Sequence, residues 1–175
     1  MSTVAGSDPA RDEQPVKVIV YSDDRTVRAA VRLALGRKVA SDLPPLEVTE
    51  FATQPALMAA VDREHFDLAV MDAEAVPAGG MGVAHQLKDE VADPPAVVLL
   101  VARTADAWLA AWSNAEAISP YPVDPVRLPQ TVAEVLHRIR EGRATQLSPE
   151  VFPAPGQSSR HGADDGHDVP QEMIR

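Results

Sequence analysis

The chain has 175 residues, of which 45% are hydrophobic and 4% aromatic, and it contains no cysteine. This length fits one domain of ordinary size with an aliphatic core, and the missing cysteine excludes disulfides and thiolate metal sites. The formal net charge of −10 repels phosphate backbones and anionic lipid surfaces within a Debye length of ~8 Å, so we expect neither nucleic acid nor a membrane as a direct partner.

The two ends of the chain are polar and carry no periodic pattern of apolar residues. Residues 1–15 have neither a basic start nor the apolar stretch of a signal peptide, and no run in the chain approaches the ~20 apolar residues that span a bilayer. From residue 142 onward Pro, Gly, Ser and charged residues dominate. We therefore expect a cytoplasmic protein with one domain over residues 16–141, between disordered segments at 1–15 and 142–175.

Between these ends, strand-like and helix-like stretches alternate. The first strand-like run is VKVIVY at 16–21, and an amphipathic stretch follows at 24–36, where Gly36 supplies a C-terminal stop. Further strand-like runs lie at 46–52, 66–72, 95–102 and 117–121. A last helical stretch at 125–142 carries five apolar residues at helical spacing, Leu128, Val132, Val135, Leu136 and Ile139. This order predicts an α/β fold with a doubly wound, five-stranded parallel sheet of the flavodoxin-like type.

An acidic residue follows directly on the third strand-like run, in the sequence FDLAVMDAEAVPAGGMG at residues 66–82. Asp72 ends the apolar run and precedes a loop of Pro and Gly. A carboxylate in such a position is costly to desolvate unless it has hydrogen-bond, charge or metal partners. Asp72 therefore marks either a chemical site or an acid that caps the turn after it.

Other polar residues are predicted to meet Asp72, because the carboxyl ends of parallel strands lie at one edge of the sheet. Ser22 and Asp23 follow the first strand, and Glu74 follows the third. Close carboxylates raise one another's pKa unless a hard cation such as Mg²⁺ binds among them. We expect Asp23, Asp72 and Glu74 to hold Mg²⁺, with a solvated loop acid as the equal alternative for Glu74. Asp24 is expected to cap the first helix, and no nucleotide cofactor is expected at this acidic helix start.

The five-strand pattern with these acids resembles the receiver domain of bacterial two-component response regulators over residues 16–138. The resemblance implies a receiver fold of five β–α units in which Asp72 accepts a phosphoryl group, Asp23 contacts Mg²⁺ and Pro122 follows a cis peptide bond. The glycine-rich loop at 79–82 and the sequence WLAAWSNAEA at 108–117 are similar to those of atypical stand-alone receivers in actinobacteria. The resemblance thus implies phosphorelay signalling by a single-domain protein.

Four positions depart from the pattern of that family. Ser22 stands in place of the first acid of the pair, Val101 in place of a Thr or Ser, Tyr121 in place of a Lys, and Ile118 in place of the usual switch aromatic. Val101 can donate no hydrogen bond, and the Tyr121 hydroxyl offers one neutral bond, about half as strong as a charge-assisted one. The resemblance therefore implies a degenerate phosphorylation pocket.

Two tryptophans, Trp108 and Trp112, lie one helical turn apart in a chain with few aromatic residues. Their spacing puts both on one face of a helix, beside small alanines. Core packing and an interface anchor for a protein partner explain this spacing equally well. We keep both interpretations.

Three functions remain, in the following order. The first is a signalling adaptor that is not an enzyme: a receiver-like domain that binds a protein partner with little or no phosphoryl control. The second is a working single-domain receiver phosphorylated at Asp72 by a histidine kinase or a small phosphodonor. The third is an enzyme with Asp72 as an aspartyl nucleophile and Glu74 as an acid. The sequence after residue 141 lacks the pattern of an effector domain, so the expected partner is a histidine kinase, a downstream protein, or a second copy bound through the fourth and fifth helices.

Overall fold

A computed structural model describes residues 14–102, 108 and 112–142. One parallel sheet has the strand order β2-β1-β3-β4-β5, and its strands are β1 (Val16–Tyr21), β2 (Leu46–Phe51), β3 (Leu68–Asp72), β4 (Ala96–Val101) and β5 (Ala117–Pro120). The helices described in full are α1 (Arg25–Leu35), α2 (Gln54–Val61), α3 (Gly80–Glu90) and α5 (Arg127–Arg140). The predicted doubly wound five-stranded sheet is confirmed. Most of the two predicted terminal segments lies outside the described residues, and the domain boundaries stay predictions.

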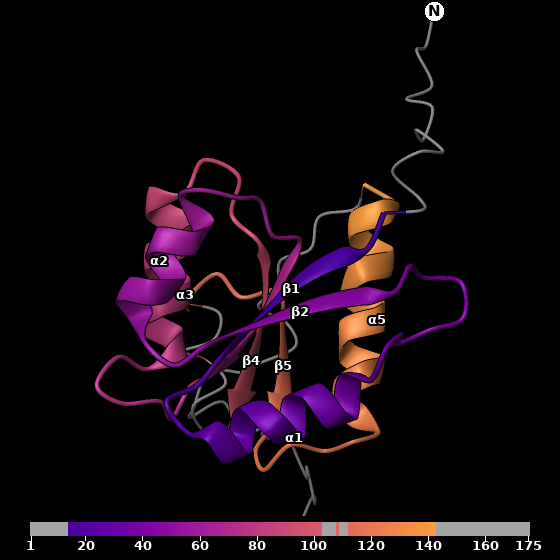
Figure 1. Ribbon diagram of the computed structural model, residues 1–175, viewed down its shortest axis with the longest axis horizontal. Helices are drawn as coiled ribbons and strands as arrows, with labels where there is room; N and C mark the ends of the chain where they lie inside the picture. Colours follow the sequence, from indigo (N-terminus) through magenta and orange to yellow (C-terminus); the bar gives the residue numbers. More distant parts are fainter. Residues whose placement is uncertain (1–13, 103–107, 109–111, 143–175) are drawn as a thin grey trace, which may run out of the picture.

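Each face of the sheet carries its own apolar core, because side chains alternate along a strand. Val18 and Val20 of β1 pack with buried residues of α1 and α5, whereas Ile19 and Tyr21 pack with buried residues of α2 and α3. Figure 1 shows these two helix pairs on opposite sides of the sheet. All residues of β3 and β4 are buried, which agrees with their near-continuous apolar sequences.

The ends of α1 follow from its capping residues. The Asp24 carboxylate accepts a hydrogen bond from the Thr26 N–H at 2.7 Å, as expected of an N-cap. Gly36 ends the helix with φ of 58°, a backbone angle that favours glycine. Of the five apolar residues at helical spacing in α5, four are buried, whereas Ile139, in the last turn, is 39% exposed.

The strand order places a switch point between β1 and β3, because the chain turns from β1 to β2 on one side and later adds β3 on the other. The loop after β3 returns close to the strand end. A Cβ atom added at Gly80 would lie 2.5 Å from the backbone oxygen of Asp72, whereas one at Gly82 would meet nothing within 4 Å. Gly80 therefore allows α3 to begin directly against the carboxyl end of β3.

These two glycines of α3 give a matched pair of substitutions. We expect Gly80→Ala to lower the free energy of unfolding by about 1–3 kcal/mol, because its methyl group would collide with backbone that cannot move freely. Gly82→Ala is expected to be neutral or to stabilise by up to about 1 kcal/mol, because alanine favours an exposed helix position. Urea unfolding of both variants measures the difference. Equal stability of the two variants would contradict the close packing at Gly80.

Candidate functional site

Asp72 lies at the predicted place, at the carboxyl end of β3, and its side chain is only 3% exposed. Both of its carboxylate oxygens accept hydrogen bonds. Oδ1 accepts from the N–H of Glu74 at 2.9 Å, and Oδ2 accepts from the hydroxyl of Ser22 at 2.7 Å. The contact with Glu74 is the turn cap that was one of the two alternatives for Asp72. The contact with Ser22 comes from the loop after β1.

Ser22 follows β1 and is fully buried beside Asp72. Its hydroxyl donates to Asp72 Oδ2 at 2.7 Å and accepts from the Asp24 N–H at 3.1 Å. The hydroxyl thus acts as the donor in one contact and as the acceptor in the other. The residue that stands in place of the first acid of the receiver family is therefore a direct partner of Asp72.

Asp23 contacts the same loop from the other side of the switch point. Its Oδ1 accepts from the N–H of Val76 at 3.1 Å. The Val76 side chain itself is largely exposed, and the Val76–Pro77 peptide bond is cis. Two carboxylates, Asp72 at the end of β3 and Asp23 after β1, thus each bind a backbone N–H of the loop at 73–79.

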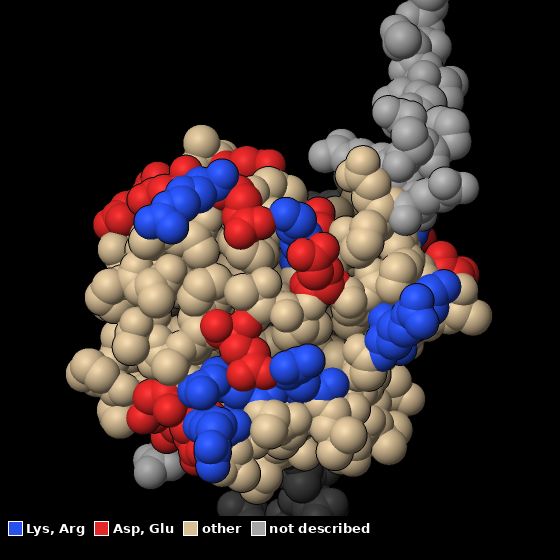
Figure 2. Space-filling view, in the orientation of Figure 1, with Lys and Arg blue, Asp and Glu red and all other residues tan. Residues whose placement is uncertain are grey.

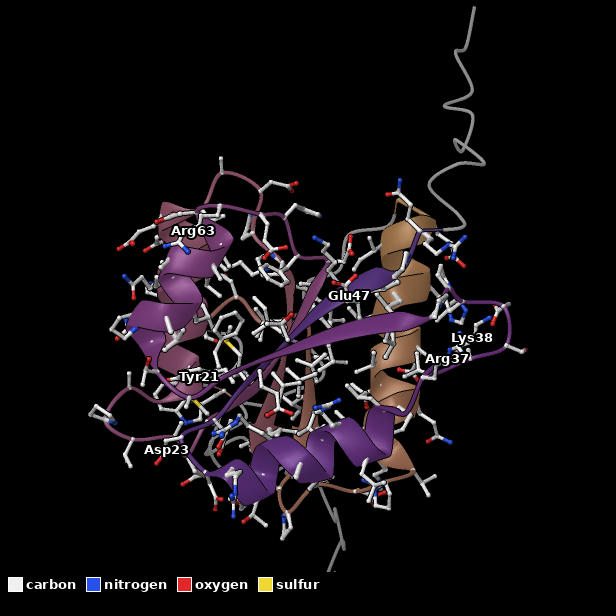
Figure 3. All side chains as sticks on the ribbon, in the orientation of Figure 1. Tyr21, Asp23, Arg37, Lys38, Glu47 and Arg63 are labelled. Atoms are coloured by element: carbon white, nitrogen blue, oxygen red, sulfur yellow. The ribbon has the colours of Figure 1, made fainter. Side chains whose placement is uncertain are left out.

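Tyr21 and Arg28 also hold these loops, and neither was predicted from the sequence as a site residue. The buried Tyr21 hydroxyl donates to the carbonyl of Ala78 at 2.6 Å, and Figure 3 shows Tyr21 near Asp23 at the carboxyl end of β1. Burial, followed by the charges of Asp23 and Asp72, raises the pKa of Tyr21. A tyrosine that ends an apolar strand was the sequence signal that could have identified this contact.

Arg28 places a positive charge beside the acidic loop. Its Nη1 donates to the carbonyl of Ser22 at 2.7 Å and to that of Asp23 at 3.3 Å. Its Nε lies 3.4 Å from Glu50 on β2, which also pairs with Arg32. Figure 2 shows Lys and Arg side chains gathered over α1 with acidic side chains beside them. The sequence signal was a cation one turn into a helix that begins directly after the acidic loop.

Val101 and Tyr121 lie at neighbouring strand ends, joined by a hydrogen bond of 3.0 Å from the Tyr121 N–H to the Val101 carbonyl. The Tyr121–Pro122 bond is cis, as the resemblance implied. Burial raises the pKa of Tyr121, and the charges of Asp72, Asp24, Glu74 and Asp23 add to the increase. The structure therefore brings this phenol into the field of the carboxylates. Ile118 packs in the α2/α3 core instead.

The arrangement of acids does not match a magnesium site. Among the residues that the structure describes, no group of three or more His, Cys, Asp or Glu side chains is placed to hold a metal ion. Magnesium takes near-octahedral oxygen ligands at about 2.1 Å. Three oxygens of Asp23 and Asp72 each accept one hydrogen bond from a protein group, which uses one of the two lone pairs on each oxygen. The expected binding of Mg²⁺ by Asp23, Asp72 and Glu74 stays a prediction that this donor set does not favour.

The tryptophan pair lies on the surface. Trp108 is 49% exposed and Trp112 is 54% exposed, so neither is a core residue. Trp112 stacks on His85 of α3 with ring centroids 4.3 Å apart and planes 20° apart. Of the two interpretations left open, the exposure favours a surface role over core packing.

The chain is similar in sequence to curated response regulatory proteins. Response regulatory proteins from two strains of Mycobacterium tuberculosis are 48% identical to the chain over 121 residues, which cover 69% of this chain and 91% of each relative. The chain belongs to the response regulator family. It is a receiver domain, the module that acts in two-component signalling. No family model matches the chain.

Solved receiver domains share the fold. That of a LuxO-type repressor from Vibrio parahaemolyticus has a TM-score of 0.64 and 17% identity, over 74% of this chain and 95% of that one. That of NarL from Mycobacterium tuberculosis has a TM-score of 0.58 and 20% identity, over 74% and 99%. The response regulator DrrB from Thermotoga maritima gives 0.60 and 20%, but the receiver covers only 54% of DrrB. In the described part of the receiver, no helix is long and apolar enough to cross a membrane.

The raised pKa of Tyr121 provides a test of the site's electrostatics. The chain has two tyrosines, so Tyr121 alone titrates in a Tyr21→Phe protein. We expect its pKa, read from phenolate absorbance, to lie above the ordinary 10.0 and to fall toward it on Asp72→Asn, because one neighbouring negative charge is removed. Since the pKa is higher in the folded state, Tyr121 supports stability below pH 10.0 and that contribution is lost as pH rises through the folded pKa.

The control for this titration is Asp93→Asn, which removes an exposed acid that pairs with His65 instead. This variant should leave the pKa of Tyr121 unchanged. An identical Tyr121 pKa with and without Asp72→Asn would show that the phenol and the carboxylate do not interact.

Proposed function

We propose that this receiver domain acts mainly by binding a protein partner, with a phosphorylation pocket that no longer works as a switch. The observation that carries the proposal is the buried hydrogen bond of 2.7 Å between Ser22 and Asp72. At a position where the family has an acid, Ser22 supplies a neutral hydroxyl that donates a hydrogen bond to the carboxylate at the phosphoacceptor position. Membership of the response regulator family is established by sequence similarity, and the proposal concerns only how this receiver signals.

The access to Asp72 supports the proposal. A carboxylate that attacks a phosphodonor must present a free oxygen lone pair to an incoming phosphorus atom. Asp72 is almost fully buried, and each of its oxygens accepts a hydrogen bond. Each oxygen keeps a second lone pair, but attack would neutralise the charge that strengthens these bonds, and a buried hydrogen bond to a charged group contributes about 1.5–3 kcal/mol.

The groups around Asp72 also offer little to a phosphoryl group. Its oxygens carry charge that a cation and a hydroxyl donor would stabilise. Val101 has no donor, and Tyr121 has a single neutral hydroxyl. Lys88 forms an ion pair of 2.6 Å with Glu116 and donates to the Pro95 carbonyl, before the start of β4 and so at the opposite edge of the sheet from Asp72.

The switch that would transmit phosphorylation is missing in the same way. A ligand shifts a conformational equilibrium only if it interacts differently with the two states. In the family, a hydroxyl and an aromatic residue provide that difference, and Val101 and Ile118 stand in their places. With both groups replaced, a phosphoryl group on Asp72 would change few contacts elsewhere.

The exposed tryptophans are the surface that we assign to the partner. Trp108 and Trp112 present large apolar side chains to solvent, and tryptophan is enriched among residues that dominate binding energy. A histidine kinase, a downstream protein or a second copy of the chain would bury them.

Incubation with acetyl phosphate or beryllofluoride in the presence of Mg²⁺ tests the loss of phosphoryl control. We expect no stable adduct by intact mass and no change in tryptophan fluorescence, because Asp72 is buried and hydrogen-bonded and the switch groups are replaced. Asp72→Ala should give the same result as the unmodified chain. A stable adduct with a fluorescence shift, both lost in Asp72→Ala, would instead establish a working receiver phosphorylated at Asp72.

A comparison of Trp112→Ala with Leu33→Ala tests the partner surface. Leu33 is 86% exposed on α1, on the other face of the sheet from α3, and serves as the matched control. A partner is first captured with the immobilised chain and then purified. We expect Trp112→Ala to weaken its binding by about tenfold or more, and Leu33→Ala to have little effect. Sedimentation of the purified receiver shows whether the partner is a second copy of the chain. Equal binding by both variants would contradict the assignment.

A further inference from the structure

We propose that Ser22, Asp23 and Asp72 form a metal-independent latch that fixes the loop at residues 73–79. By latch we mean these three side chains together with the backbone N–H groups that they bind. The inference deepens the proposed function, because it explains what the acids do in a pocket that has lost its switch. It assigns them a conformational role that needs neither a divalent ion nor a phosphoryl group.

The contacts of the latch join the carboxyl ends of β1 and β3 to one loop. Asp72, at the end of β3, accepts from the Glu74 N–H at 2.9 Å. Asp23, after β1, accepts from the Val76 N–H at 3.1 Å. Each acid thus satisfies a donor of the loop, and hydrogen bonds from backbone N–H to a carboxylate are stronger than neutral ones. The loop is held at two points that are two residues apart.

Ser22 completes the latch where a third carboxylate would otherwise stand. Its hydroxyl proton points to Asp72 and its lone pair accepts from the Asp24 N–H, so the orientation of the hydroxyl is set from both sides. An acid at this position would repel Asp72 and require a cation between them. The serine removes one negative charge and supplies a donor, so the pair is stable without an ion.

Arg28 holds the backbone of the loop that carries Ser22 and Asp23. It donates to the carbonyls of these two residues at 2.7 and 3.3 Å, and its Nε pairs with Glu50 of β2 at 3.4 Å. Arginine keeps its charge at all physiological pH values. The latch residues Ser22 and Asp23 are thus held in place through their backbone by a side chain of α1, without an ion.

The far end of the loop is anchored independently of the acids. Tyr21 donates to the Ala78 carbonyl at 2.6 Å, and the backbone at Gly80 lies against Asp72. The latch therefore governs the part of the loop at residues 74–76. The expected consequence is a loop whose shape is the same in the presence and absence of Mg²⁺.

Thermal unfolding with excess Mg²⁺ and with EDTA tests the metal independence. We expect the unfolding midpoint of the unmodified chain to be the same in both. Ser22→Asp should unfold at a lower temperature in EDTA, because it adds a like charge, and should be restored toward the unmodified value by Mg²⁺. A rise in the midpoint of the unmodified chain with Mg²⁺, absent in Asp72→Asn, would overturn the proposal.

Hydrogen–deuterium exchange of single amides, measured in EDTA, tests the latch contacts and does not depend on Ser22→Asp folding. We expect Asp23→Ala to quicken exchange at the Val76 amide by about tenfold or more, and Ser22→Ala to quicken it at the Glu74 amide, because their acceptors are removed or loosened. The Thr26 amide, bound to Asp24, is the internal control. Unchanged exchange at both loop amides would overturn the proposal.

These measurements use neither a phosphodonor nor a partner. An adduct on Asp72 would therefore refute the proposed function while leaving the latch contacts standing. Conversely, a Mg²⁺ response of the unmodified chain would refute the latch while leaving partner binding intact.

Discussion

The buried carboxylate of Asp72 is the constraint on which the carboxyl edge of this sheet depends. A charge at 3% exposure must be compensated, and the chain does so with hydrogen bonds from Ser22 and from the loop after β3. These contacts draw the β1 and β3 loops together. In the latch that we propose, this compensation is internal and requires no external cation. The same fold that provides a phosphoryl switch in its family can therefore serve as a static scaffold.

The surrounding electrostatics follow from that choice. Arg28 lies against the carbonyls of the acidic loop, and the two tyrosines of the chain both lie in the field of Asp72 and Asp23. The Arg28 guanidinium is held by these carbonyls and by Glu50 of β2, so it fixes the loop after β1 against α1 and β2.

Much of the fold was predictable because it depends on local pattern. The five strand-like runs match the five strands to within two residues at either end, and both helices delineated in the sequence are present. The exposure of Ile139 could not be read from helical spacing, which says nothing of where the sheet beneath a helix stops. The tryptophans were left undecided because spacing alone cannot tell a core face from a surface face. Asp72 and Asp23 were identified because parallel strands end at one edge of the sheet.

The sequence by itself determined the parallel sheet, the acidic strand ends and the replaced family positions, since these follow from hydrophobic periodicity and residue identity. Only the tertiary structure decided which groups pair with those acids. Ser22 and Asp72 are 50 residues apart, and Asp23 and Val76 are 53 apart, so their contacts exist only once β1 and β3 are neighbours in the sheet. Hydrogen bonds act over about 3 Å, and no periodic pattern along a chain encodes that distance between segments so far apart.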